Sequence, residues 1–146
     1  MGETSLEDLR VIVTRPQFQA QELAQSLTVL GAEVLQIPGL DIWPAPESWA
    51  VRQQFQNLDA YQHVIFTSVN AVHFGMQWID RYWPQWPQGL NCYSVGPGTA
   101  KALTAHHIVS FLPTRFSSEG LLELPALMSV SEARVLIVKG QGGRSL

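Results

Sequence analysis

The stretch 63–72 constrains the fold of this chain more than any other part of the sequence. Residues 64–66 are a short apolar run of β-forming side chains, which predicts a buried strand. The small polar residues Thr67 and Ser68 follow, and apolar side chains then recur at helical spacing at Val69, Val72, Met76 and Ile79. In an α/β sheet, ligands bind beyond the carboxyl ends of the strands, where such turns lie.

The same order of strand and polar turn is found three more times. Strands are predicted at 11–13, 92–95 and 135–138, and the turns that follow them are Thr14-Arg15-Pro16, Gly96-Pro97-Gly98-Thr99 and Lys139-Gly140-Gln141-Gly142-Gly143-Arg144. If the strands are parallel, these turns gather along one edge of a sheet. The pattern therefore predicts an α/β fold built from parallel-sheet units of the Rossmann or flavodoxin type.

The first 38 residues predict one right-handed parallel β-α-β unit. Its strands are expected at 10–14 and 34–37. A helix is expected between them, beginning near Pro16 and ending at Gly31. The proline-rich segment 38–46 then predicts a crossing into a second domain. A short exposed strand or ladder is expected at 40–42 because apolar and polar residues alternate there.

The second domain is expected to begin with a helix at 48–58 that carries Trp49, Phe55 and Leu58 on one side. The Gly-Pro-Gly-Thr turn precedes a helix that opens at Ala100. A further strand is predicted at 108–112. Ser117 or Ser118 should then cap a helix, and Pro125 should interrupt it because proline removes a backbone donor.

Composition narrows the functional class of this chain of 146 residues. The hydrophobic fraction of 46% supports a substantial core, but no apolar run reaches the roughly 18 residues of a membrane span. One cysteine and four scattered histidines predict no disulfide, no metal and no organic cofactor. The net charge of −3 disfavours nucleic acid as a partner. A cytoplasmic location is expected.

Six segments, in this order, resemble the uroporphyrinogen-III synthase family. They are Val13-Thr14-Arg15-Pro16, Gly31-Ala32-Glu33-Val34 with Ile37-Pro38, Ile65-Phe66-Thr67-Ser68-Val69-Asn70-Ala71-Val72, Val95-Gly96-Pro97-Gly98-Thr99-Ala100, Ser117-Ser118-Glu119-Gly120-Leu121-Leu122, and Val138-Lys139-Gly140-Gln141-Gly142-Gly143-Arg144. No segment is diagnostic alone, but together they extend over almost the whole chain.

The resemblance implies two α/β domains joined by a two-stranded ladder, with the active site in the cleft between them. Residues 1–38 would open a discontinuous first domain, and residues 39–146 would form most of the second. The returning part of the first domain, and the tyrosine that family members carry beyond the last unit of the second, would lie past the chain end. The expectation is that residues 1–146 alone do not efficiently catalyse the family's reaction, the closure of a tetrapyrrole ring.

The implied reaction is the cofactor-free cyclisation of hydroxymethylbilane, a linear tetrapyrrole bearing acetates and propionates. The family releases water, inverts ring D through a spiro intermediate, and yields uroporphyrinogen III. Positioning of the substrate is the implied source of catalysis. The expected partner is this small molecule, with no nucleic acid, no membrane and a monomeric protein.

Candidate substrate-binding residues are those whose polar groups suit a polycarboxylate. Each also has a purely structural interpretation: the serines, Thr67 and Asn70 as helix caps, Thr99 as part of its turn, and the arginines in surface ion pairs. Lys139, Gly140 and Arg144 flank a glycine-rich turn that could form an anion nest. The full set is Arg15, Thr67, Ser68, Asn70, Thr99, Ser118, Lys139, Gly140 and Arg144.

Two other functions are compatible with the sequence. A nucleotide-binding α/β protein is disfavoured because neither glycine-rich turn matches a dinucleotide fingerprint or a P-loop. A non-catalytic module that binds tetrapyrroles or other polycarboxylates remains as the alternative to the synthase.

Overall fold

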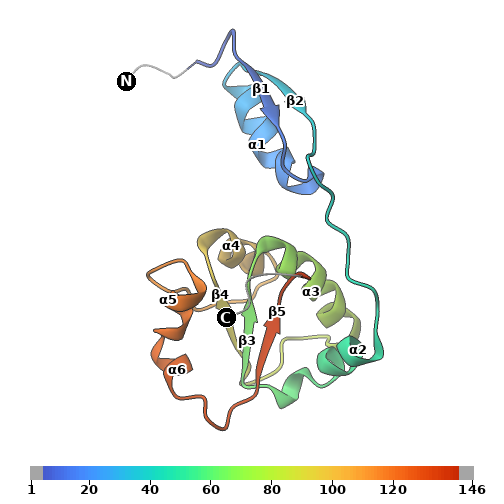
Figure 1. The fold of residues 1–146 in the computed structure, drawn as a ribbon, viewed down its shortest axis with the longest axis vertical. Coiled ribbons are helices and arrows are strands. Elements are labelled where there is room, and N and C mark those ends of the chain that lie inside the picture. The colour runs from blue at the N-terminus through green and yellow to red at the C-terminus, as the bar shows by residue number, and fades with distance from the viewer. Residues whose placement is uncertain (1–4, 142–146) are drawn as a thin grey trace. The chain divides into compact units, whose positions relative to one another are not determined.

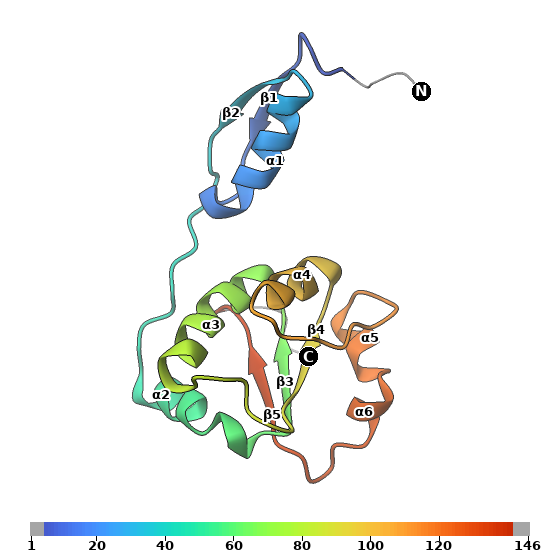
Figure 2. The ribbon, with the colours of Figure 1, turned by 180° about the vertical axis from the view of Figure 1, so that it is seen from behind.

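The computed structural model describes residues 5–141 (Figures 1 and 2). The chain forms two compact units, Met1–Trp43 and Pro44–Leu146, which are called here the N-terminal unit and the C-terminal unit. Each is described by itself. None of the described helices is both long and apolar enough to cross a membrane.

The N-terminal unit is one β-α-β unit, as predicted. It consists of β1 (Arg10–Val13), α1 (Gln17–Val29) and β2 (Glu33–Gln36). The two strands are parallel, with Arg10 opposite Glu33 and Val13 opposite Gln36. Pro16 precedes the first turn of α1, and Gly31 ends the helix with a φ of +97°, a conformation that favours glycine.

One face of this two-stranded sheet is open. Val13 of β1 and the helix residues Ala20 and Ala24 are buried together on the α1 side. Because side chains alternate along a strand, Ile12 and Leu35 point to the opposite face, where they are 60% and 55% exposed. Nothing within the described residues of this unit covers them.

The expected ladder at 40–42 is wrong for the described residues. The segment 37–48 contains no strand. The N–H groups of Ile37 and Gly39 still donate to the carbonyl oxygens of Val13 and Thr14, but among the described residues no backbone hydrogen bond continues this pairing through 40–42. Alternation of apolar and polar residues indicates that an extended segment has one apolar and one polar side, but a ladder also needs a second strand as hydrogen-bonding partner.

The C-terminal unit is built on a three-stranded parallel sheet of order β4-β3-β5. Its strands are β3 (His63–Phe66), β4 (Asn91–Ser94) and β5 (Val135–Val138). All four residues of β3 are buried, which confirms the central strand predicted from the sequence. A further segment reaches the free edge of β4 only at Phe111, so the strand expected at 108–112 is a single bridge to Tyr93. Pro113, which has no N–H to donate, follows closely.

Helices cover both faces of this sheet (Figure 1). One face packs against α2 (Trp49–Gln56), the 3-10 turn η1 (Leu58–Ala60), α3 (Val69–Tyr82) and α4 (Pro97–Ala105). Phe55 and Leu58 are buried there, but Trp49 is 76% exposed, which corrects the expectation that it shares their side. At about 100° per residue, Trp49 and Phe55 are some 120° apart around the helix.

The other face packs against α5 (Ser118–Leu122) and α6 (Pro125–Met128). Their residues Leu121 and Leu127 form a second core cluster with Ile65 and Tyr93 of the sheet. Pro125 does interrupt the helix, as predicted, and it becomes the first residue of α6.

Candidate functional site

Three turns lie at one edge of the C-terminal unit's sheet. The parallel register places Phe66 beside Ser94 on one side and beside Val138 on the other, so the three strands end in one row. The residues that follow them, 67–68, 95–99 and 139–140, are called here the carboxyl-edge site. This confirms that the Thr67, Thr99 and Lys139 turns share one edge.

Backbone hydrogen bonds hold these turns to the sheet. The N–H of Thr67 donates to the carbonyl oxygen of Val138 at 3.2 Å, and the N–H of Val95 donates to that of Phe66 at 3.4 Å. The Thr67 hydroxyl also donates to the Val138 carbonyl, at 3.3 Å. Its hydrogen is therefore used within the fold, and towards a ligand it can act as an acceptor only.

Ser68 is the N-cap of α3. Its Oγ accepts a hydrogen bond from the backbone N–H of Ala71 at 3.1 Å. A hydroxyl that accepts one bond still has a hydrogen to donate, so capping and ligand binding are compatible at Ser68. Asn70 lies within the first turn of α3 and is half-buried.

Thr99 belongs to the helix rather than to a preceding turn. The sequence predicted a helix from Ala100, but α4 begins at Pro97 because proline suits the first helical position. The Thr99 side chain is only 6% exposed as a result. What this turn can offer a ligand directly is the backbone N–H groups of the first turn of α4, which have no partner inside the helix.

Gly96 and Gly98 have no structural need to be glycine. Gly96 caps α4 with φ −152° and ψ 169°, nearly the values at the serine N-caps Ser68 and Ser117. A β-carbon at Gly96 would meet nothing closer than the Phe116 Cβ at 4.0 Å, and one at Gly98 would meet Val69 Cγ2 at 3.7 Å. These are ordinary contacts, so within residues 5–141 the fold has room for a side chain at either glycine.

The third turn follows β5. Lys139 and Gly140 lie directly beyond Val138, and no described atom lies within 4 Å of where a Gly140 β-carbon would be. Arg144, with Gly142 and Gly143, lies outside the described residues, so the expected anion nest is described only at its start.

The two remaining candidates belong to other parts of the chain. Ser117, rather than Ser118, caps α5: its Oγ accepts from the Gly120 N–H at 3.0 Å, and Ser118 is the first, exposed residue of that helix. Arg15 follows β1 in the N-terminal unit, where its exposed guanidinium donates to Gln19 Oε1 at 3.3 Å.

The C-terminal unit also contains a buried polar pair that was not predicted from the sequence. His63 Nδ1 lies 3.0 Å from the Tyr93 hydroxyl, and both side chains are buried. His63 is the first residue of β3, so this pair lies away from the carboxyl-edge site. Only the β-strand position of both residues could have suggested their proximity.

Burial also defines the chemistry of the single cysteine. It raises the pKa of the Cys92 thiol to about 12, because the thiolate would lose its hydration. Burial likewise raises the pKa of Tyr93, with repulsion from Cys92 adding to it. Cys92 is thus a packed thiol rather than a nucleophile. Among residues 5–141, no three His, Cys, Asp or Glu side chains come together as a metal site.

Comparison with known proteins identifies relatives over most of the chain. Residues 21–146 match the family model described as uroporphyrinogen-III synthase HemD. A uroporphyrinogen-III synthase of Proteus mirabilis is 29% identical over 141 residues, which are 94% of this chain and 70% of that protein. One from Escherichia coli K12 is 30% identical over 143 residues, 94% of this chain and 57% of that protein.

The fold has a solved counterpart as well. The crystal structure of uroporphyrinogen-III synthetase from Helicobacter pylori matches with a TM-score of 0.56 at 19% identity, over 84% of this chain and 55% of that one. This likeness shows the α/β fold. The chain thus spans between 55% and 70% of the length of these relatives.

Proposed function

Because the chain belongs to the uroporphyrinogen-III synthase (HemD) family, we propose that it supplies substrate-binding structure to an enzyme that cyclises hydroxymethylbilane. The product is uroporphyrinogen III, formed with inversion of ring D and loss of water, which makes the enzyme a hydro-lyase of tetrapyrrole biosynthesis. We further propose that it acts in the cytoplasm as a monomer without a cofactor.

The observation that carries this proposal is the carboxyl-edge site with its unexplained glycines. A linear tetrapyrrole bears several carboxylates, and carboxylates bind well to backbone N–H groups at the start of a helix. Such contacts require close approach to the backbone, and a side chain at Gly96 or Gly98 would obstruct it. The fold does not need these glycines, so access for a ligand is the reason we propose for them.

Each candidate residue has a defined role in this proposal. Ser68 donates its hydroxyl hydrogen to a substrate carboxylate, and Thr67 shapes the turn beside it. Thr99 acts through its backbone N–H, because its side chain is buried. Cationic and further polar contacts come from Lys139, Gly140 and Arg144 after β5, from Asn70 and Ser118, and from Arg15 in the N-terminal unit. Catalysis follows from holding the two ends of the linear tetrapyrrole in the geometry that closes the macrocycle with ring D inverted.

We also propose that the N-terminal unit is the opening of a larger domain, with residues 1–38 as its first β-α-β unit and residues 39–146 as most of a second domain. The support is the open apolar face of its two-stranded sheet, at Ile12 and Leu35. A two-stranded sheet with one helix is marginal as an independent domain, so further strands are expected to complete it.

The test uses the protein expressed from its full reading frame, supplied with hydroxymethylbilane, with the two uroporphyrinogen isomers resolved by chromatography. Gly96→Ser should preserve the fold and improve the cap of α4, yet raise KM about tenfold and shift product towards the uninverted isomer that forms spontaneously. Gly98→Ala should act in the same direction, with a gain in helix propensity.

Ala126→Ser, which adds a hydroxyl on the exposed side of α6, is the matched control and should leave KM unchanged. If both glycine variants retain the parent KM and isomer ratio, the carboxyl-edge site does not bind substrate. If the parent binds uroporphyrinogen but forms no type III isomer, the non-catalytic tetrapyrrole-binding module is the better interpretation.

A further inference from the structure

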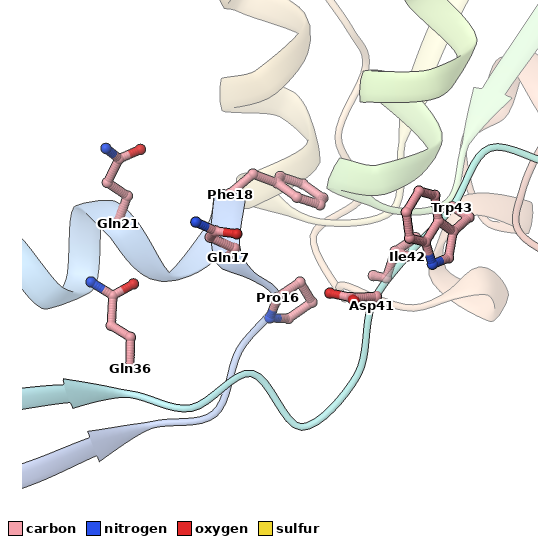
Figure 3. A pocket seen from close by; sticks show the side chains of 8 residues that line it. All are labelled: Pro16, Gln17, Phe18, Gln21, Gln36, Asp41, Ile42 and Trp43. Atoms are coloured by element: carbon pink, nitrogen blue, oxygen red, sulfur yellow. The ribbon is translucent and has the colours of Figure 1, made fainter.

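The N-terminal unit contains a hollow of about 560 Å³, which lies outside the carboxyl-edge site. It lies between the start of α1 and the extended segment that follows β2 (Figure 3). Figure 3 shows the Asp41 side chain directed towards Pro16, with Phe18 on the helix side and Trp43 at the far end. The remaining lining residues are Gln17, Gln21, Gln36 and Ile42.

The lining has an unusual chemistry for a protein that handles a polycarboxylate. Its eight residues include no lysine, arginine or histidine, and their one charged group is the carboxylate of Asp41. A substrate carboxylate placed there would be repelled and would lack a cationic partner. A neutral ring with an N–H donor suits the hollow, since aromatic side chains offer contact area and a carboxylate is a strong acceptor.

We propose that this hollow holds a pyrrole ring of the linear tetrapyrrole, with the Asp41 carboxylate accepting the pyrrole N–H and Phe18 in contact with the ring. The inference rests on the proposed function and adds to it the part of the substrate recognised here. It also separates two tasks: the carboxyl-edge site takes carboxylates, and this hollow takes a ring. The volume is ample for one substituted pyrrole.

The sign of the effect at Asp41 tests the proposal. Asp41 is exposed and lies outside every helix and strand, so Asp41→Asn preserves the fold. If a pyrrole N–H is bound there, the weaker acceptor raises KM for hydroxymethylbilane about threefold to tenfold. If a carboxylate lies there instead, removal of the negative charge lowers KM. Either a lower or an unchanged KM overturns the proposal.

A second variant and two controls complete the experiment, which uses the protein from its full reading frame. Phe18→Leu should also raise KM, whereas Leu23→Ala, at a partly exposed position further along α1, should not. Asp59→Asn, at an exposed aspartate of the C-terminal unit, should leave KM unchanged and controls for loss of one negative charge from a protein that binds a polyanion.

The controls also separate this inference from the proposed function. If the parent protein neither binds the tetrapyrrole nor forms type III isomer, the proposed function fails and this inference fails with it. If the parent forms type III isomer and either Phe18→Leu or Asp41→Asn matches it in KM, only the hollow's role is overturned.

Discussion

The two units contain parallel sheets made from the same local pattern, yet they bury their strands very differently. In the C-terminal unit, helices cover both faces and every residue of β3 is buried. In the N-terminal unit, one helix covers one face, and Val13 is the only fully buried residue of β1. The strand–turn–helix pattern therefore specifies the elements, whereas the number of covering elements decides how much apolar surface leaves water.

This difference has an energetic consequence. Burial of apolar surface contributes about 25 cal/mol per Å², so a strand covered on both faces contributes far more than one covered on a single face. A pair of strands is also marginal by itself, because backbone ordering costs about 1–2 kcal/mol per residue. We expect the two units to respond unequally to equivalent substitutions.

The largest expected effect contrasts Phe66 with Ile12. Phe66→Ala removes a fully buried ring from the C-terminal core and should lower the free energy of unfolding by about 3–5 kcal/mol. Ile12→Ala, on the open face of the N-terminal unit, should change it by no more than about 0.5 kcal/mol.

Denaturant titration measures the first effect through Trp83 and Trp86, whose indole N–H groups donate to backbone carbonyls in the C-terminal unit. Hydrogen exchange of the β1–β2 amides measures the second. A cost at Ile12 as large as that at Phe66 would mean that something covers the open face in solution, and the contrast between the units would not hold.

The same contrast shows which predictions the sequence could support. The apolar run of β3, the cap at Ser68 and the helix break at Pro125 each depend on a few neighbouring residues, and all were predicted. Their outcome is decided by local hydrogen bonding and by side-chain pattern. Such features can be read without knowledge of distant parts of the chain.

Features that depend on a distant partner were predicted poorly. The segment 108–112 has a strand-like composition, but only Phe111 reaches β4. The ladder at 40–42 lacks a partner among the described residues, and the His63–Tyr93 pair joins residues thirty positions apart. The carboxyl-edge site was predicted because parallel strands align their turns, but the burial of Thr99 depends on where α4 begins.

A smaller effect concerns Cys92, a buried titratable residue of β4 in the well-covered sheet. Its pKa is raised from 9.0 to about 12, so folding favours the protonated thiol. That contribution is fully present below pH 9 and is lost as the pH rises towards 12. Tyr93, whose pKa is also raised, adds to the loss in the same direction.

Cys92→Ala should therefore cost about 1 kcal/mol at neutral pH and lose less further stability than the parent on going to alkaline pH. Denaturant midpoints at neutral pH and between pH 9 and 12 measure the difference. Parallel curves for parent and variant across that range would show that folding does not raise the pKa of the Cys92 thiol.

The smallest expected effects come from surface ion pairs, and here too the units differ. In the C-terminal unit, one oxygen of Glu47 accepts from Arg52 at 2.8 Å and lies 3.3 Å from Arg81, whose guanidinium lies over the Trp78 ring. In the N-terminal unit, Glu33 pairs with Arg10 across β1 and β2, and both side chains are largely exposed. Glu47 makes two contacts when its side chain is ordered, whereas Glu33 makes one, so the conformational entropy lost per ion pair is smaller at Glu47.

Glu47→Gln should lower the melting temperature of the C-terminal unit by about 1–3 °C, and Glu33→Gln should alter hydrogen exchange of the β1–β2 amides very little. Because these charges face water, the Glu47 effect should shrink at high salt. If salt does not reduce the effect of Glu47→Gln, the effect comes from packing of the segment before α2 and not from charge.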